Sequence, residues 1–246
     1  DTLRSGDREK KLVFLTARVH PGESPASFVC QGVIDFLVSQ HPVAQVLRDH
    51  VIFKIVPMLN PDGVYLGNYR YERSLNKGLQ VSRWLAPWVS LEFYIDVHAH
   101  STMLNGFMYG NVFEDEERVQ RQAVFPRLLC QNAPDFSFSN TSFNRDVVKA
   151  GTGRRFLGGL LDDTSYCYTL EVSFYSYMTA GSTATVPYTE ETCILHRVEK
   201  DPLRGIKEEE RFVESDKDPT YEKYVLPPPC TRSGGAGGYR RSPSAL

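Results

Sequence analysis

The sequence is poor in the features that mark several classes of protein: it has little cysteine, no long hydrophobic run and almost no excess charge. The five cysteines form no CxxC pair, and an odd number of widely spaced thiols does not fit a disulfide scaffold. We therefore expect reduced thiols and an intracellular protein. The cysteines are Cys30, Cys130, Cys167, Cys193 and Cys230.

No apolar stretch approaches the roughly 18 residues that a membrane-spanning helix needs, and the polar start DTLRSGDREK is unlike a secretory signal. The formal net charge is −2, so no bulk positive field attracts nucleic acid or an anionic membrane. We expect neither of them as a partner. An acidic substrate would have to be bound by a local basic pocket.

What the sequence does contain is the pattern of a folded α/β domain. Hydrophobic residues make up 41% of the 246 residues, which is enough for a sizeable core. From Lys11 to about Lys200, short apolar runs alternate with longer amphipathic ones, which indicates a mostly parallel sheet. Runs rich in Val, Ile, Phe and Tyr predict buried strands at 12–19, 51–59, 91–97 and 166–174.

Three helices are predicted between and after these strands. The first follows the strand at 12–19, with Ser24 as its cap and Pro25 in its first turn. The second runs from Asp115 towards Asn132 and is interrupted or kinked at Pro126. The third begins near Thr189.

The composition changes after Lys200. Residues 201–226 form a charge-rich extension, and residues 227–246 have the Pro, Gly and Ser content of a flexible tail. We expect no fold in either segment. The chain also opens almost directly onto its first strand, so we expect that upstream elements are missing.

Two stretches have the spacing His-x-x-Glu, which lets an imidazole and a carboxylate reach one metal ion. His196 and Glu199 lie on an expected helix among charged residues, so we interpret them as part of a solvated polar face. His20 and Glu23 directly follow a buried strand, at the sheet edge where open α/β sheets bind ligands. Ordinary turn and helix-start chemistry is the alternative for this second pair.

The strand predicted at 91–97 leads into a cluster of polar residues. Alternate residues of a strand face the same way, so Asp96, His98 and His100 share one side. Burying unpaired polar groups costs free energy, and a bound metal ion would give them a partner. In the alternative interpretation, one histidine is paired with Asp96 and the other is exposed.

The strand at 166–174 carries a single acidic residue, Glu171, in an otherwise apolar and aromatic run. Glutamate is rarely buried unless it is paired or functional. Glu171 is therefore a candidate for catalysis. A salt bridge to Arg154 or Arg155 is the structural alternative.

Four motifs, taken in order, resemble those of the zinc metallocarboxypeptidase superfamily. Within it they are most similar to the cytosolic carboxypeptidases, also called Nna-like or ATP/GTP-binding-protein-like deglutamylases, and among these to the short type-six subfamily. The resemblance covers about residues 11–200. The motifs are His20-Pro21-Gly22-Glu23, then Asn60-Pro61-Asp62-Gly63 with Arg70 shortly after, then Asp96-Val97-His98-Ala99-His100-Ser101, and finally Thr169-Leu170-Glu171.

The resemblance implies a carboxypeptidase-like fold, a mixed, mostly parallel sheet with helices on both faces. Residues 1–200 would form the catalytic domain, with an atypical segment at 71–90. The implied cofactor is one zinc ion (Zn2+), held by His20, Glu23 and His98 with a fourth position left for water. Glu171 is implied as the group that accepts the water's proton.

Further roles are implied around this centre. Arg70 would stabilise the oxyanion and orient the substrate. Asp96 would orient a metal-binding histidine as its hydrogen-bond partner, and His98 is the histidine we expect it to hold. His100 is expected to lie outside the zinc shell.

Substrate recognition is implied at two places. Family members anchor the terminal carboxylate with an Asn-Arg pair; the segment 71–90 lacks that motif, and Asn76 and Arg83 are partial substitutes. The cationic stretch Gly151-Thr152-Gly153-Arg154-Arg155 resembles one in the deglutamylases, so Arg154 or Arg155 is expected to bind an acidic side chain. A solvated basic loop is the alternative.

The implied function is hydrolysis of C-terminal or side-chain polyglutamate on proteins such as tubulin. We expect a monomeric cytoplasmic enzyme, associated with microtubules, centrioles or cilia. One alternative is an impaired isoform that binds acidic protein tails without cleaving them. Another is a deacylase of small N-acyl amino acids. The phosphate-loop pattern GxxxxGK[ST] does not occur, so the sequence does not support nucleotide binding.

Overall fold

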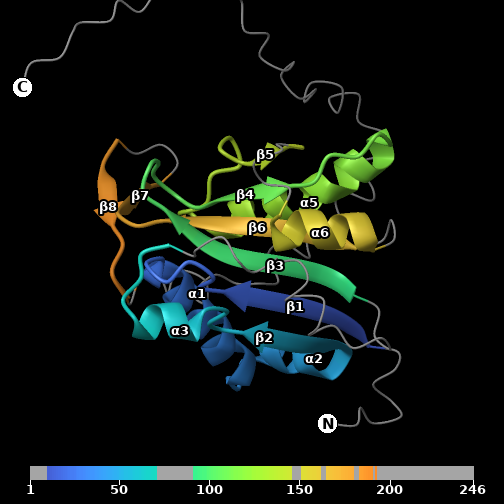
Figure 1. The fold of residues 1–246 in the computed structure, drawn as a ribbon. Coiled ribbons are helices and arrows are strands. Elements are labelled where there is room, and N and C mark those ends of the chain that lie inside the picture. Colours follow the sequence, from blue (N-terminus) through green and yellow to red (C-terminus); the bar gives the residue numbers. More distant parts are fainter. Residues whose placement is uncertain are drawn as a thin grey trace, which may run out of the picture. The chain divides into compact units, whose positions relative to one another are not determined.

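The sheet that organises the fold contains six strands in the order β2-β1-β3-β6-β4-β5 (Figure 1). The structure is a computed structural model, and it describes residues 10–70, 91–145, 151–161, 165–179, 183–190 and 192. Strands β2, β1, β3 and β6 run parallel, β4 is antiparallel to β6, and β5 is parallel to β4. The six strands are β1 (Lys11–Ala17), β2 (Val51–Val56), β3 (Leu91–His100), β4 (Phe107–Gly110), β5 (Ser142–Phe143) and β6 (Tyr166–Ser173).

Helices cover both faces of this sheet, which confirms the predicted fold class. On one face, α1 and α5 pack against alternate residues of the central strands. On the other face, α6 contributes Leu157 to a second core cluster with Phe14 and Tyr94. The helices are α1 (Ser24–Val38), α2 (Pro42–His50), α3 (Pro61–Tyr65), α5 (Glu116–Asn132) and α6 (Gly153–Leu160), and a small separate hairpin consists of β7 (Ser176–Met178) and β8 (Thr185–Pro187).

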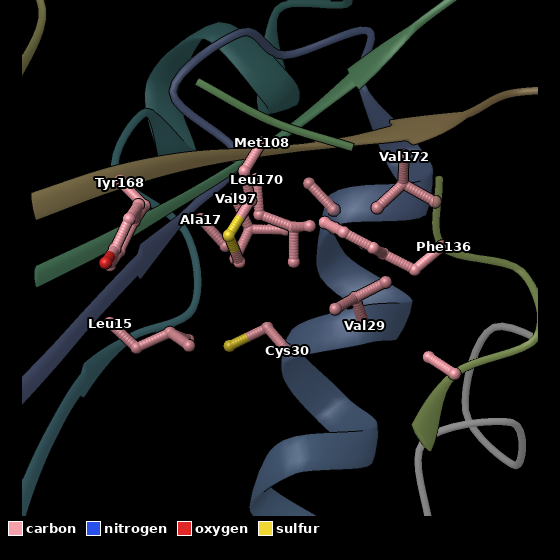
Figure 2. Close-up of a cluster of buried hydrophobic side chains, with 12 residues drawn as sticks. Leu15, Ala17, Val29, Cys30, Val97, Met108, Phe136, Tyr168, Leu170 and Val172 are labelled. Atoms are coloured by element: carbon pink, nitrogen blue, oxygen red, sulfur yellow. The ribbon is translucent and has the colours of Figure 1, made fainter. Parts of the chain in front are cut away.

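The larger core cluster lies between α1 and the central strands. Figure 2 shows Val29 and Cys30 of the helix with Val97 and Leu170 of the sheet above them and Leu15 beside Cys30. Fully burying an aliphatic side chain of this size contributes about 1.5–3 kcal/mol to folding. This packing holds the first turn of α1 against the carboxyl ends of β1 and β3, the position of the candidate site.

The predicted strands are present, but several of their boundaries differ from the prediction. Strand β1 ends at Ala17 because the next residue, Arg18, has a left-handed backbone with φ of 56°. Strand β3 continues three residues beyond the predicted end at 97, to His100. The prediction that 51–59 is buried is wrong: β2 ends at Val56 and its residues are half-buried, because it forms the edge of the described sheet.

The helix predictions need two corrections. Glu23, rather than Ser24, is the N-cap of α1, and its side chain makes no capping hydrogen bond because it is engaged by β3. Helix α5 runs from Glu116 to Asn132 with Pro126 inside it, so the predicted interruption does not occur. Asp115 caps α5 by accepting a hydrogen bond from the Arg118 amide.

The end of the described chain is consistent with a third helix start near Thr189. The side chains and amides of Thr189 and Thr192 exchange hydrogen bonds, which is a capping arrangement. His196, Glu199 and the predicted segments 201–226 and 227–246 lie outside the described residues. Among the described residues, no helix has the length and apolar character required to span a bilayer.

Candidate metal centre

The turn between β1 and α1 carries the first two candidate ligands, His20 and Glu23. The side chain of Arg18, at the start of the turn, makes two hydrogen bonds across it. Its Nε donates to the Pro21 carbonyl at 2.7 Å, and its Nη1 donates to Ser27 Oγ at 2.9 Å. These bonds tie the end of the strand to the first turn of the helix. The spacing of the two ligands along the turn is therefore held by side-chain bonds as well as by the backbone.

Gly22 lets a distant segment close over this turn. Its amide donates to the Tyr69 carbonyl at 3.0 Å, and a Cβ at this position would lie 2.8 Å from the Tyr69 ring. Only glycine permits this approach without displacement of the aromatic ring. Arg70, the next residue, is thereby brought to the same end of the sheet.

Strand β3 brings the third candidate ligand, His98, against the turn. Its Nδ1 lies 3.0 Å from Glu23 Oε2, and the Ala99 amide donates to the same oxygen at 3.1 Å. The rings of His20 and His98 have centroids 5.1 Å apart. One ligand atom from each of the three residues falls within 4.8 Å of the others, close enough for one shared ion.

The centre is buried and electrostatically coupled. Glu23 and His98 are each 7% exposed. Burial acts to raise the pKa of Glu23, but the hydrogen bond from His98, the nearby imidazoles and the Ala99 amide outweigh it, so the net shift is downward. Burial acts to lower the pKa of His98, but the charge of Asp96 and the bonds to both carboxylates raise it well above its ordinary value. The pocket therefore favours an anionic Glu23 beside a positive charge.

Asp96 holds the opposite side of the His98 ring. Its Oδ2 lies 3.0 Å from His98 Nε2, and its side chain is almost completely buried. The ring is thus fixed between two carboxylates, with Nδ1 towards Glu23 and Nε2 towards Asp96. Such a carboxylate partner is typical of histidines that bind metals, because it fixes both the ring orientation and the tautomer.

A cavity of about 440 Å³ opens over these residues. Glu171 reaches it from β6, where it is paired in register with His98 of the neighbouring β3. Arg70 reaches it from the segment that follows α3. The cavity is lined by His20, Glu23, Tyr69, Arg70, His98, Ala99, His100, Ser101, Thr102, Tyr109, Thr152, Thr169, Glu171 and Phe174.

The chain resembles known carboxypeptidases in sequence. Residues 2–88 match the zinc carboxypeptidase family, peptidase family M14. It is 60% identical to human cytosolic carboxypeptidase 6 over 256 residues, which cover 95% of this chain and 49% of that protein. It is 48% identical to cytosolic carboxypeptidase 6 of Caenorhabditis elegans over 191 residues, or 68% of this chain and 41% of the relative. The chain belongs to the cytosolic carboxypeptidase family of zinc carboxypeptidases.

This family member spans about half the length of the curated relatives that it matches. Its fold is that of solved carboxypeptidases. A metallo-carboxypeptidase from Burkholderia cenocepacia superposes with a TM-score of 0.67 at 24% identity, covering 86% of this chain and 60% of that one. A putative carboxypeptidase A from Shewanella denitrificans gives the same TM-score at 20% identity, covering 84% and 60%. These similarities support the fold alone.

Arg154 and Arg155, the two described arginines predicted to bind substrate, do not line the cavity of this carboxypeptidase-family chain. Arg154 is 0% exposed, and its Nη1 donates to the Gly110 carbonyl and, at 2.8 Å, to Asn111 Oδ1. Burial lowers its pKa to about 10. Neither Arg154 nor the half-buried Arg155 is among the described residues that line the cavity. On α6, Arg154 faces the protein interior. It therefore does not form the expected pocket for an acidic substrate side chain.

Two further predictions concern residues around the cavity. Asn76 and Arg83 lie outside the described residues. His100 lines the cavity with both ring nitrogens in hydrogen bonds: Nε2 contacts the Asn105 carbonyl at 3.1 Å and Nδ1 accepts from the Met103 amide at 3.4 Å. This geometry agrees with the expectation that His100 is no metal ligand, and it shows a role in holding the loop after β3.

Several residues that line the cavity are not among the predicted site residues. Thr169 can be predicted as a lining residue, because it lies two positions before Glu171 on the same strand and faces the same side of the sheet. Thr152 is the N-cap of α6, and the sequence marks it only as a member of a cationic stretch. Tyr69 and Tyr109 carried no local signal, since only the long-range packing of their segments brings them to the cavity.

Proposed function

We propose that this protein is a zinc-dependent metallocarboxypeptidase that hydrolyses C-terminal or side-chain polyglutamate on proteins such as tubulin. One observation carries the proposal: a cluster of three potential ligands and an additional carboxylate, Glu171, share a single cavity. Membership of the cytosolic carboxypeptidase family supports the same reaction. We also propose a cytoplasmic location with association to microtubules, centrioles or cilia, because these are the sites of tubulin tails.

The residues present fit a zinc ion. His20 and His98 supply nitrogen and Glu23 supplies carboxylate oxygen, which is the donor set of a catalytic zinc site with one open position. When bound, the ion would polarise the scissile carbonyl and lower the pKa of the attacking water. The buried negative charge of Glu23 and Asp96 offsets the cost of placing a cation there.

Glu171 is the proposed general base. Its carboxylate lines the cavity from the strand next to His98, and it is half-buried, so it can meet both solvent and a bound peptide. It would accept a proton from the attacking water at its carboxylate oxygen and then donate that proton to the departing amine. Proton transfer of this kind contributes about 10²–10⁴-fold to the rate.

Arg70 is the proposed electrophilic and substrate-orienting group. It is the one arginine or lysine among the described residues that line the cavity, and it is exposed to incoming substrate. A planar guanidinium binds carboxylates and developing oxyanions through two parallel N–H groups. Asn76 and Arg83 remain predictions for anchoring the terminal carboxylate, and Arg155 remains a prediction for binding the glutamate side chain.

The decisive experiment couples zinc stoichiometry to glutamate release. The protein is assayed on a glutamate-ended peptide and on a branched polyglutamylated peptide, before and after removal of metal with a chelator. We expect one zinc per chain, release of free glutamate, loss of release on chelation and recovery with zinc. The Glu171→Gln variant should keep zinc and lose release. Binding of acidic peptides that survives this substitution in a parent that itself releases no glutamate would favour the non-cleaving alternative.

A further inference from the structure

Behind the metal centre, a chain of buried polar side chains runs from His98 into the sheet. Asp96 contacts His98 through Oδ2, and its other oxygen, Oδ1, accepts a hydrogen bond from Thr16 Oγ1 at 2.8 Å. Thr16 Oγ1 also lies 3.0 Å from the hydroxyl of Tyr94. Thr16 and Tyr94 are 0% exposed, so neither hydroxyl exchanges its partners with water.

Strand pairing fixes this chain in place. Thr16 of β1 is the register partner of Asp96 on the parallel neighbour β3. Tyr94, Asp96 and His98 are alternate residues of β3 and therefore lie on one face of the sheet. Gly153, the first residue of α6, packs against the Tyr94 hydroxyl at the end of this chain of hydrogen bonds. A Cβ at position 153 would lie 2.4 Å from that hydroxyl. The glycine makes room for an internal hydroxyl, so it needs no ligand to explain it.

The hydrogen bonds have a defined direction. A carboxylate only accepts hydrogen bonds, so the single hydroxyl proton of Thr16 is donated to Asp96 and the Tyr94 hydroxyl donates to Thr16. In the same way, His98 Nε2 carries the proton that faces Asp96 Oδ2. Glu23 is also a carboxylate, so Nδ1 of His98 donates to its Oε2 in this structure, and a metal ion would take the place of that proton.

We propose that Thr16 is a positioning residue for the metal centre: its hydroxyl orients the Asp96 carboxylate, which in turn fixes Nδ1 of His98 as the metal-binding atom. The inference rests on the proposed zinc site. The Thr16 bond is one of the contacts that set the rotation of the Asp96 carboxylate, so its removal should loosen the hold of Asp96 on the His98 ring. Outer partners of this kind change metal affinity without touching the ion.

The test measures zinc affinity by competition with a chromophoric chelator in the parent and in the Thr16→Val, Thr16→Ser and Thr141→Val variants. Valine matches the shape of threonine without the hydroxyl, whereas serine keeps it. Thr141 is the matched control, because its hydroxyl also bridges two groups of the fold, Met108 and Ser137. We expect about tenfold weaker zinc binding for Thr16→Val, and affinity within about twofold of the parent for the other two variants.

Nitrogen NMR of the zinc-loaded parent provides a second measurement that does not depend on any variant folding. We expect His98 to bind zinc through Nδ1 and to keep its proton on Nε2. The inference is overturned if His98 binds through Nε2, or if Thr16→Val binds zinc as tightly as the parent while His98→Ala does not bind. A parent that takes up no zinc instead overturns the proposed function on which the inference rests.

Discussion

His98 and Glu171 occupy paired positions on the adjacent parallel strands β3 and β6. Both side chains line the same cavity, so a potential metal ligand and a potential proton acceptor are placed side by side by sheet register alone. Because the sheet is held by continuous parallel pairing from Phe93 to His100, neither group can shift along its strand independently.

This pairing predicts that the two residues can be separated functionally. Glu171→Gln should lower glutamate release by at least about 10²-fold, because the amide cannot accept a proton, while zinc stoichiometry stays at the parent value. His98→Ala should lose both. Steady-state kinetics and metal analysis of the two variants check the expectation. Equal loss of zinc in both would contradict the role of Glu171 as a base outside the metal shell.

Arg154 is expected to contribute to stability and not to substrate binding. Arg154→Met keeps much of the volume but leaves the Gly110 carbonyl and Asn111 without their donor, so the free energy of unfolding should fall by about 2–4 kcal/mol. The KM for a glutamate-ended peptide should not change. Urea denaturation and peptide kinetics test this, and Arg155→Met, at the half-buried neighbouring position, is the control for the stability measurement alone. A large rise in KM at parental stability would restore Arg154 to the substrate site.

Arg18 is expected to support the metal-binding turn. Arg18→Gln removes the bonds to the Pro21 carbonyl and to Ser27, which should cost about 1–2 kcal/mol of stability and weaken zinc binding several-fold. Arg48→Gln is the matched control, because Arg48 also makes two hydrogen bonds, to the carbonyls of Leu37 and Ser39, in the connection between α1 and α2. It should lose stability but keep its zinc affinity. Equal zinc affinities in the two variants would argue against the role of Arg18.

The buried thiols are expected to be inert at neutral pH. Burial raises the pKa of Cys30 to about 11 and that of Cys167 to about 12. Alkylation followed by mass spectrometry at pH 8 should therefore modify Cys130, which is half-buried, well before either of them. In the unfolded chain these thiols ionise near pH 8.5–9, whereas in the folded protein they stay protonated. The free energy of unfolding should therefore fall as the pH rises above about 9. Rapid modification of Cys30 in the folded protein would contradict this.

The order of strands and helices could be predicted from the sequence because it depends on local patterns. Apolar runs predicted β1, β3 and β6, and the Pro-containing start of α1 was found to within one residue. The ligand set His20, Glu23 and His98 is implied by the resemblance of the motifs to those of zinc carboxypeptidases, and the place of His20 and Glu23 directly after a buried strand favours it. Hydrophobic periodicity and motif chemistry depend only on residues that are close in the sequence, so they can be recognised before the fold is known.

Only the tertiary structure decided which side chains meet. The edge position of β2 exposes residues that the pattern assigned to the interior, since burial depends on what packs outside a strand. Arg154 lies in a basic stretch, yet the packing of α6 buries its guanidinium against a distant strand. Thr16 and Asp96 meet across two strands far apart in sequence. Such contacts depend on the register of paired strands and on how each helix is rotated against the sheet. Both are set by packing of the whole core, so they cannot be predicted from a short stretch of sequence.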